Sequence, residues 1–522
     1  TLFRSLFGKN GEAPNDSILY KNLNIHYYDK LQVRPNMLYR WMNYQQFVRS
    51  KQMRASNRTR LYSQYRQEQV QEKLSQLGIF SYMDMQYAPR DTTAACDTLD
   101  VTMQATFAKP LDAELELNVV TKSNDQTGPG ASFGVTRNNV FGGGESWNVK
   151  LKGSYEWQTG GGEKSSLMNS WEMGLSTSLT FPRVVFPHLG KREFDFPATT
   201  TFRLYINQLN RAKYYKLLSF GGNATYDFQP SRTSRHSITP FKLTFNVLQH
   251  QSEDFKEIAE ANPALYVSLR NQFIPAMEYT YTYDNASGRR IKNPIWWQST
   301  VTSAGNITSL IYRAFGKPFN EEDKSLLGAP FAQFVKLNTE LRHLWNIDKN
   351  NAIASRMAVG ALFTYGNATI APYSEQFYVG GANSIRAFTV RSVGPGGYHP
   401  EEGKYSYLDQ TGTFRFEANV EYRFRIFKSF WGATFLDAGN VWLLRKDRKL
   451  LADGKEARPN SQLRLKTFPK QIALGTGVGI RYDMDILVFR LDFGIPLHLP
   501  YDTERSGYYN VTGAFFKNLG IH

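Results

Sequence analysis

The residues from Thr413 to Ile426 alternate strictly between polar and apolar side chains, seven of each kind. Successive side chains of a β-strand point to opposite faces, so this pattern gives one polar face and one apolar face. Such a strand separates water from an apolar medium. The polar members are Thr413, Arg415, Glu417, Asn419, Glu421, Arg423 and Arg425.

The same period of two recurs from residue 111 onward and predicts about 16 strands, many of about 9–14 residues. Strands of this length can span a bilayer when they are tilted, whereas strands of ordinary globular proteins have about 5–6 residues. A soluble propeller would repeat every ~40–50 residues, and no such repeat is present. We therefore predict an all-β transmembrane barrel of antiparallel strands. The expected strand starts are Ala113, Ala131, Ser146, Trp171, Ala198, Tyr214, Ser237, Phe273, Ile295, Ala332, Ala352, Gly412, Ser429, Gln471, Ile486 and Val511.

The first 110 residues carry a helical signal that the rest of the chain lacks. No Gly or Pro occurs between Ser50 and Gly78, and the apolar residues within this run recur on one helical face. Gly78 suits the end of that helix. With an earlier helix and three short strand-like pieces, residues 23–110 predict a small α+β domain in the order β-α-α-β-β.

The charge balance points to an anionic neighbour. Lys and Arg number 62 against 46 Asp and Glu, which gives a net charge of +16. No nucleic-acid motif accompanies this charge, so no nucleic-acid partner is predicted. Cys96 is the single cysteine, which excludes a disulfide framework. Since no catalytic, metal-ligand or cofactor motif stands out, we predict a protein that is not an enzyme and needs no metal or cofactor.

Three motifs follow one another in the second half of the chain. The long connection at about 366–411 contains a glycine pair followed by a short basic and aromatic motif, and the strands beyond it carry Phe435-Leu-Asp437-Ala-Gly439 and a glycine-rich run at 475–482. In order and spacing these motifs resemble the BamA/TamA superfamily of outer-membrane assembly and translocation proteins. The residues of the connection that carry the resemblance are Gly380, Gly381, Ser384, Ile385, Arg386, Ala387 and Phe388.

The resemblance implies that the connection folds back into the barrel lumen and that Arg386 pairs there with Asp437. Phe435 and Gly439 share that strand with Asp437 and are expected beside the pair. Ala387 stands where the family usually has glycine, a departure from the pattern. The glutamates of the alternating stretch are expected to line a solvated lumen wall, with one of them a weaker candidate as second partner of Arg386.

The resemblance also divides the chain. It implies a periplasmic POTRA domain at 23–110, the tail of a preceding periplasmic segment at 1–22, and the barrel at 111–522. A short first strand, Ala113–Val120, and a last strand at 511–522 are expected to meet at a weak seam, the lateral gate proposed for the family. The apolar gate residues are Leu115, Leu117, Val119, Phe515, Leu519 and Ile521.

The function implied is the assembly, insertion or translocation of barrel proteins in the bacterial outer membrane. The partners implied are unfolded client proteins, outer-membrane lipids and accessory lipoproteins or periplasmic subunits. A TamA-like lipoprotein is one form that the resemblance allows. The alternative is a pore of the two-partner-secretion type, which exports one substrate through the lumen, and a third reading is a structural or adhesive barrel.

Overall fold

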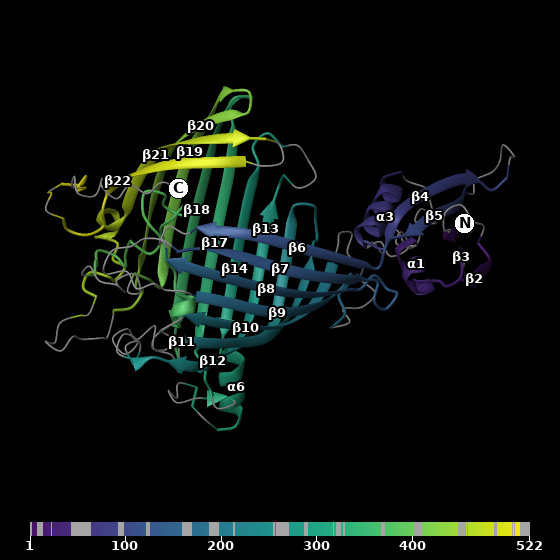
Figure 1. The fold of residues 1–522 in the computed structure, drawn as a ribbon, viewed down its shortest axis with the longest axis horizontal. Coiled ribbons are helices and arrows are strands. Elements are labelled where there is room, and N and C mark those ends of the chain that lie inside the picture. The colour runs from purple at the N-terminus through teal and green to yellow at the C-terminus, as the bar shows by residue number, and fades with distance from the viewer. Residues whose placement is uncertain are drawn as a thin grey trace, which may run out of the picture.

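The computed structural model describes most of the chain. The described residues are 3–7, 14–21, 23–42, 64–91, 99–121, 126–158, 170–186, 198–211, 215–253, 256, 271–286, 291–316, 318–319, 325–326, 329–366, 371–400, 410–446, 456, 458–484, 488–503, 505 and 507–511. They form two units, a small N-terminal domain and a large curled sheet (Figure 1).

The N-terminal domain is a five-stranded sheet covered by two helices. Along the sheet the strands run β2-β3-β1-β5-β4, and β1 is parallel to both of its neighbours. Leu38 and Leu74 from the helices bury completely against Leu23, Ile25 and Met103 of the strands. The elements are β1 (Phe3–Phe7), β2 (Asp16–Tyr20), β3 (Leu23–Tyr27), α1 (Pro35–Met42), α3 (Gln64–Gln76), β4 (Phe80–Pro89) and β5 (Leu99–Phe107).

This arrangement changes the expected role of residues 1–22. They were predicted as the tail of a separate preceding segment, but β1 lies between β3 and β5, and β2 pairs with β3. Five residues in the middle of a sheet pair with strands about 20 and 100 positions away, which no local pattern reveals. The remaining order of strands and helices from 23 to 107 follows the predicted one, and Gly78, which ends α3, has the left-handed φ expected of such a position.

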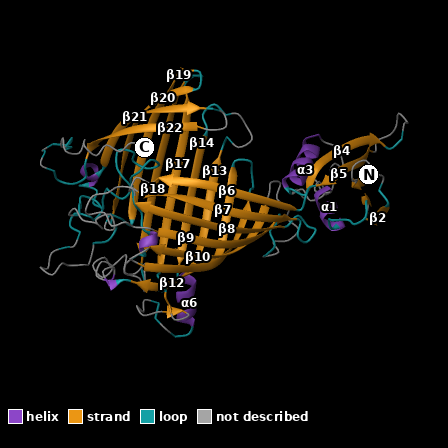
Figure 2. Ribbon diagram, viewed as in Figure 1, coloured by secondary structure: helices purple, strands orange, loops and turns teal. Residues whose placement is uncertain are grey.

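The large unit is one antiparallel sheet of 15 strands in which every strand pairs with its neighbours along the chain. Figure 2 shows these strands curling into the wall of a barrel. The strands are β6 (Leu111–Thr121), β7 (Gln126–Asn138), β8 (Ser146–Gln158), β9 (Ser170–Phe181), β10 (Ala198–Arg211), β11 (Tyr215–Phe228), β12 (Ser234–Gln251), β13 (Gln272–Asp284), β14 (Ile295–Ala304), β17 (Phe334–Asn346), β18 (Asn351–Thr364), β19 (Phe414–Phe427), β20 (Phe430–Trp442), β21 (Ala473–Asp483) and β22 (Val488–His498).

Fifteen of the predicted strands are confirmed, each starting within about five residues of its expected position. The sixteenth was expected at 511–522. Val511 is described and belongs to no strand, and the rest of that segment lies outside the described residues. The first strand was expected to be short, but β6 has 11 residues. The strand extends two residues before Ala113 and one beyond Val120.

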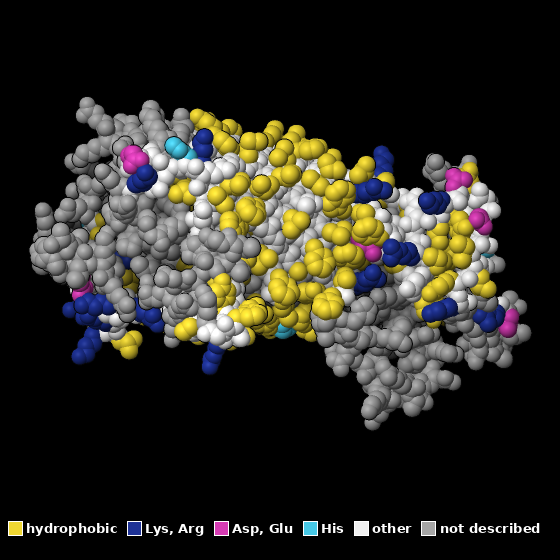
Figure 3. Space-filling view, turned by 90° about the horizontal axis from the view of Figure 1, so that it is seen from below, with side chains coloured by type: hydrophobic (Ala, Val, Ile, Leu, Met, Phe, Trp, Pro, Cys, Tyr) yellow, Lys and Arg dark blue, Asp and Glu magenta, His cyan; other side chains and the backbone are white. Residues whose placement is uncertain are grey.

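On the barrel wall the apolar side chains are exposed on the outer face and the charged side chains are buried on the inner face, the reverse of a soluble protein. On β19 the apolar Val420 and Ile426 are 48% and 52% exposed, whereas Glu417 and Glu421 are 1% and 6% exposed. On the face shown in Figure 3, exposed apolar side chains form a band across the middle of the wall, and charged side chains gather toward its two ends. This pattern explains the strict alternation, because the outer face requires an apolar surrounding and the inner face a polar one.

The two ends of the barrel differ. At one end the strands are joined by short turns at 139–145, 229–233 and 347–350, and we call it the turn end. The other, which we call the loop end, carries the longer connections 305–333, 365–413 and 443–472, together with the short helix α6 (Asn306–Ala314) and the two-residue strands β15 (Ser325–Leu326) and β16 (Ala329–Pro330). In the described part of the chain, no helix is both long and apolar enough to cross a membrane.

The N-terminal domain docks on the turn end. The backbone N–H of Arg34 donates to the carbonyl of Gly142 at 2.7 Å, and Asn139 Nδ2 donates to the carbonyl of Gln32 at 2.8 Å. Gly142 and Asn139 both belong to the turn between β7 and β8. The domain is therefore held beside the first strands of the sheet, as Figure 1 shows.

Candidate functional site

The connection between β18 and β19 returns into the barrel and packs on the inner wall. Its described part covers 365–366, 371–400 and 410–413. The side chains of Val379, Ile385 and Phe388 are 3% exposed or less and cluster with Val441 of β20 and Ala473 of β21. A connection that could have remained in solvent is thus folded against the wall strands, and we call its described part from 371 to 400 the lumen loop.

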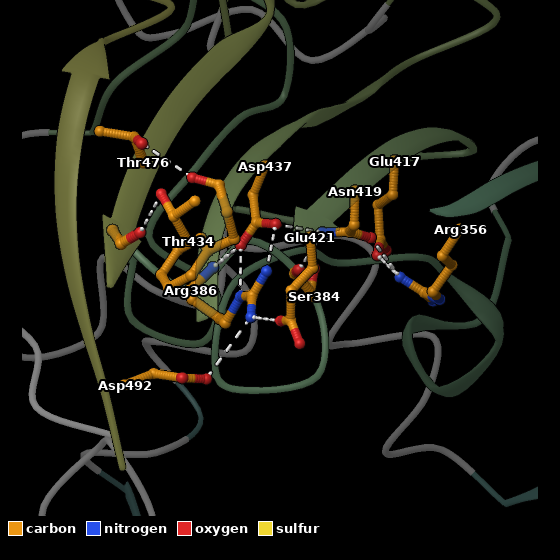
Figure 4. Close-up of polar contacts among 12 residues, drawn as sticks. Arg356, Ser384, Arg386, Glu417, Asn419, Glu421, Thr434, Asp437, Thr476 and Asp492 are labelled. Atoms are coloured by element: carbon orange, nitrogen blue, oxygen red, sulfur yellow. Dashed lines mark hydrogen bonds and ion pairs between the residues drawn. The ribbon is translucent and has the colours of Figure 1, made fainter. Parts of the chain in front are cut away.

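Arg386 and Asp437 meet at the centre of this contact. Arg386 Nε donates to Asp437 Oδ2 at 2.8 Å and Nη2 donates to Oδ1 at 2.9 Å, which makes a two-pronged pair (Figure 4). The backbone N–H of Arg386 donates to Oδ2 as well, at 3.0 Å. Arg386 is 4% exposed and Asp437 is fully buried. Fork geometry and burial both strengthen such a pair, so it fixes the loop against β20.

Two further carboxylates surround the same guanidinium. Arg386 Nη1 donates to Glu421 of β19 and also lies 3.5 Å from Oδ2 of Asp492 on β22. Burial acts to lower the pKa of Arg386, but its bonds to Asp437 and Glu421 outweigh burial and raise that pKa above its ordinary value. Arg386 therefore ties the loop to three wall strands.

Other arginines balance the remaining negative charge. Arg481 of β21 lies between Glu421 at 3.1 Å and Asp492 at 2.7 Å. Arg490 Nε donates to Asp492 at 2.7 Å, and Arg423 Nε donates to Glu421 at 2.8 Å. The buried carboxylates are thus compensated by paired cations, as buried charges require.

All three residues of the Phe435, Asp437 and Gly439 pattern face the lumen loop. The guanidinium carbon of Arg386 lies 3.5 Å from the centroid of the Phe435 ring. A methyl group on Gly439 would approach Ile385 to 3.2 Å and the carbonyl oxygen of Phe416 to 2.9 Å. The strand therefore supplies an aromatic face, a carboxylate and a gap, each matched to the loop.

The glycine pair of the motif makes a tight turn that brings Arg386 to the wall. Gly380 and Gly381 have φ values of 106° and 91°, which side chains rarely permit. The turn is closed by Ser384 Oγ, which accepts the N–H of Gly380 at 3.0 Å, and by the carbonyl of Phe388, which accepts the N–H of Gly381 at 2.7 Å.

Ala387, which stands in place of the usual glycine, needs no special backbone here because its φ is not positive. The close approach of the loop to the wall is instead made possible by glycines of the wall strands. A methyl on Gly475 would lie 2.5 Å from Ala387 Cβ, and a methyl on Gly494 would lie 2.8 Å from Ala387 Cα. Glycines on β21 and β22 therefore make the room for the alanine.

A second contact, which sequence reasoning missed, holds the lumen loop to β17 and β18. The Phe377 ring packs directly on Gly360. A methyl group added to Gly360 would lie 2.5 Å from Cζ of Phe377. Lys336 Nζ lies 5.0 Å from the ring centroid and bonds Glu375 of the loop at 3.1 Å. The glycine inside a predicted strand was the available signal, since such a glycine often marks a close approach of another segment.

Asn419 connects the Arg386 cluster to a neighbouring ionic cluster. Its amide nitrogen donates to Asp437 Oδ1 and to the carbonyl of Ser384, both at 2.8 Å, and its Oδ1 accepts Arg356 Nη1 at 3.1 Å. Arg356 also bonds Glu417 at 2.7 Å and Glu340 at 3.0 Å. The expected solvated wall is instead a paired network, in which Glu421 is the glutamate that contacts Arg386.

The expected gate residues fall into two groups. Leu115, Leu117 and Val119 lie on β6 and are 66%, 74% and 73% exposed on the outer face. Phe515, Leu519 and Ile521 lie outside the described residues. Among the described strands β6 pairs with β7 alone and β22 with β21 alone, so these two strands end the sheet.

The remaining lumen residues that were missed share a detectable signal. Arg490, Asp492, Gly494 and His498 alternate with the outward Phe489, Leu491, Phe493 and Ile495 on β22, so a period-two reading places them inward. Within the described part of the chain, no cluster of three His, Cys, Asp or Glu side chains is arranged to hold a metal ion. Among the described residues, the inward side chains hold the lumen loop to the wall through ion pairs and hydrogen bonds.

A curled sheet that is apolar outside and ionic inside, with a loop pinned in its lumen, defines a membrane-type β-barrel. The model of the Omp85 superfamily domain matches residues 139–516, and the chain belongs to the Omp85 superfamily. The expected resemblance is thereby confirmed at the level of the superfamily, whose members are outer-membrane assembly and transport proteins.

Several solved structures are similar to this chain. A BamA from Haemophilus ducreyi that lacks POTRA domains 1–3 is similar at a TM-score of 0.58 and 12% identity, over 97% of this chain and 87% of that one. CdiB from Acinetobacter baumannii matches at a TM-score of 0.47 and 12% identity, over 84% of this chain and 66% of that one. CdiB from Escherichia coli matches at 0.43 and 12%, over 93% and 77%. The BamA likeness supports the barrel fold.

Proposed function

We propose that this protein inserts or assembles other β-barrel proteins in the bacterial outer membrane, and that the end of its sheet at β6 is where a client strand pairs. The observation that carries this proposal is the position of β6. Its 11 residues pair with β7 on one side, and no other described strand pairs with its second side. Free N–H and C=O groups along such an edge can template an incoming strand.

The N-terminal domain supports the same reading. We propose that it is a POTRA domain in the periplasm, where it receives unfolded clients and accessory subunits. Its docking on the turn between β7 and β8 holds it next to the strand at which a client would enter. The outer-facing Leu115, Leu117 and Val119 of β6 then offer the client an apolar path into the lipid.

The alternative function is a pore that exports one substrate through the lumen. The lumen loop opposes this alternative, because Arg386 ties it to three strands and Phe377 ties it to two more. Export through the lumen would require the loop to leave both contacts. A conductance measurement in planar bilayers distinguishes the two, since a pore conducts steadily and a plugged barrel does not.

The proposal is tested by locking the edge. In a Cys96→Ser background, one cysteine replaces Asn118 of β6 and a second is moved along 511–522 until the two crosslink. Cells that depend on this protein are then followed for the outer-membrane levels of several barrel proteins, with and without reductant. We expect the crosslink to lower those levels and reductant to restore them.

The control crosslink joins two strands that no client needs to separate. Thr136 and Asn148 face each other on β7 and β8 and are hydrogen-bonded at 2.8 Å, so cysteines there should crosslink without distortion. The control crosslink should leave all barrel proteins at their normal levels. If the locked edge also leaves them normal, the edge is not used and the assembly function is wrong.

A further inference from the structure

The helix α6 is fixed to the barrel at the loop end, directly after β14. The backbone N–H of Gly305 donates to the carbonyl of Pro275 on β13 at 2.8 Å. Gly305 has a φ of 71°, and a methyl group there would lie 2.6 Å from the carbonyl oxygen of Ala332. Only glycine fits this junction, and it fixes the direction in which the helix leaves the strand.

One side of α6 packs on the protein. Thr308 and Ser309 are buried, and the Tyr312 ring lies 6.0 Å from the ring of Phe331, in the segment that leads into β17. These three residues share one side of the helix, since they fall within about 100° of one another at about 100° per residue. The side of the helix that carries Thr308, Ser309 and Tyr312 is therefore covered by contacts within the barrel.

The opposite side of α6 is apolar and bare. Ile307, Leu310 and Ile311 are 44%, 57% and 51% exposed, and Phe315, just after the helix, is 84% exposed. The spacing of three and four residues puts the first three on one stripe. In a nine-residue helix, such a stripe is costly in water and needs an apolar surrounding.

We propose that this stripe inserts into the headgroup and acyl-chain boundary of the outer leaflet, so that α6 is an interfacial lipid anchor of the barrel. Amphipathic helices of this kind lie in the plane of the interface with the apolar face buried about 5–10 Å. The proposal rests on the membrane setting given above but not on the assembly activity.

Continuity with the lipid-facing wall favours lipid as the occupant. β14 ends at Ala304, and its outward Val301 is 40% exposed, as is Met277 of β13 at 38%. The helix begins two residues after this apolar wall ends, so its exposed apolar residues continue the apolar surface of the wall. Exposed Arg313, in the last turn, suits the phosphates of anionic lipids beside the stripe.

The helix α6 follows a strand near the middle of the sheet. Eight strands, β6 to β13, precede β14 in the sheet and six, β17 to β22, follow it. The anchored wall is therefore near the middle of the sheet, far from both of its ends. Holding this wall at a fixed depth would leave the two ends of the sheet free to move relative to the membrane.

The test places an environment-sensitive fluorophore on Leu310→Cys in the Cys96→Ser chain, reconstituted in vesicles of phosphatidylethanolamine and phosphatidylglycerol. Leu204→Cys on the outer face of β10 is the lipid reference, and Leu465→Cys, 89% exposed at the loop end, is the water reference. Quenching is measured with aqueous iodide and with lipids that carry a doxyl group near the headgroup. Phe315→Cys, just after the helix, provides a second labelling position if the first label disturbs folding.

We expect the helix label to emit at shorter wavelength than the Leu465 label, to be quenched by the doxyl lipid and to resist iodide. Quenching by iodide to the extent seen at Leu465 would overturn the anchor. Protection from both quenchers would overturn it too, because a protein surface and not lipid would then cover the stripe. If the Leu204 label itself avoids the doxyl lipid, the membrane setting fails, and with it the anchor.

Discussion

The guanidinium of Arg386 lies against the Phe435 ring, at 3.5 Å from the centroid, while it bonds Asp437 two residues further along the same strand. The strand thus offers a flat aromatic surface and a carboxylate to one planar cation. Both contacts depend on the planarity and the fork of arginine, and neither can be reproduced by the single ammonium of lysine.

Arg386→Lys should therefore loosen the lumen loop although it keeps the charge. A lysine would retain one ion pair at best and leave buried carboxylate oxygens without a partner. We expect the free energy of unfolding to fall by about 3 kcal/mol, as when a buried pair is broken. Urea unfolding of the protein in detergent micelles, followed by tryptophan fluorescence, measures this change.

Arg425→Lys is the matched control, since Arg425 lies exposed at the turn end of β19. Its Nε donates to the carbonyl of Lys428 at 2.7 Å, and its guanidinium lies 5.8 Å from the centroid of the Trp431 ring. Its effect should stay within about 0.5 kcal/mol. Equal effects of the two substitutions would show that the fork and the aromatic contact of Arg386 contribute nothing.

Gly360→Ala should destabilise the barrel through a single neighbour. The three atoms nearest to the added methyl group all belong to the Phe377 ring, at 2.5, 2.6 and 3.0 Å. Overpacking of this kind costs about 1–3 kcal/mol. Protease cleavage within the lumen loop should become faster, because the ring must move off the wall.

The same substitution in a Phe377→Ala background should cost less than about 0.5 kcal/mol, since the clash has been removed. A double-mutant cycle on the four proteins gives the coupling. If Gly360→Ala lowers the free energy of unfolding equally in the wild-type and in the Phe377→Ala background, the strain lies in the strand itself. The contact between Phe377 and β18 would then not stabilise the protein.

Asn419→Asp should be worse than Asn419→Ala. The alanine loses the hydrogen bonds to Asp437 and Ser384, at a cost of about 1–2 kcal/mol. The aspartate loses the same bonds and sets a second carboxylate beside Asp437, and such like charges cost several kcal/mol. Urea unfolding of both variants decides the order, and the reverse order would mean that Arg356 alone governs the position of Asn419.

The N-terminal domain should lose stability in acid through Asp16. Tyr27 Oη donates to Asp16 Oδ2 at 2.6 Å, and this bond, with that of the Ser17 N–H, lowers the pKa of the Asp16 carboxyl. A carboxyl with a lowered folded pKa contributes stability above its unfolded value of about 3.9, and loses it as pH falls through the folded value.

Thermal unfolding of the full chain between about pH 6 and pH 3 tests this. The wild-type protein should lose more of its midpoint temperature than Tyr27→Phe, which lacks the phenol bond. Tyr82→Phe, at an exposed position on β4, should follow the wild type. Parallel curves for all three proteins would show that the bond does not stabilise the domain.

The sequence by itself determined the strands of the barrel and which residues face its lumen. Period two is a local property, because side chains of one strand alternate whatever the strand pairs with. For this reason the starts of 15 strands were predicted closely, and Glu417 and Glu421 were placed on one inward face. The resemblance of three motifs then directed attention to Arg386 and its partner.

Only the tertiary structure decided what those inward residues meet. Arg386 is 106 positions from Asp492, and Gly360 is 17 from the ring that fills its place, so neither contact leaves a periodic trace in the chain. The central position of β1 in the N-terminal sheet and the bare stripe on α6 are of the same kind. Alternation fixes a face, but a contact is fixed by how the curled sheet and the returning loop share one interior, and that depends on every strand at once.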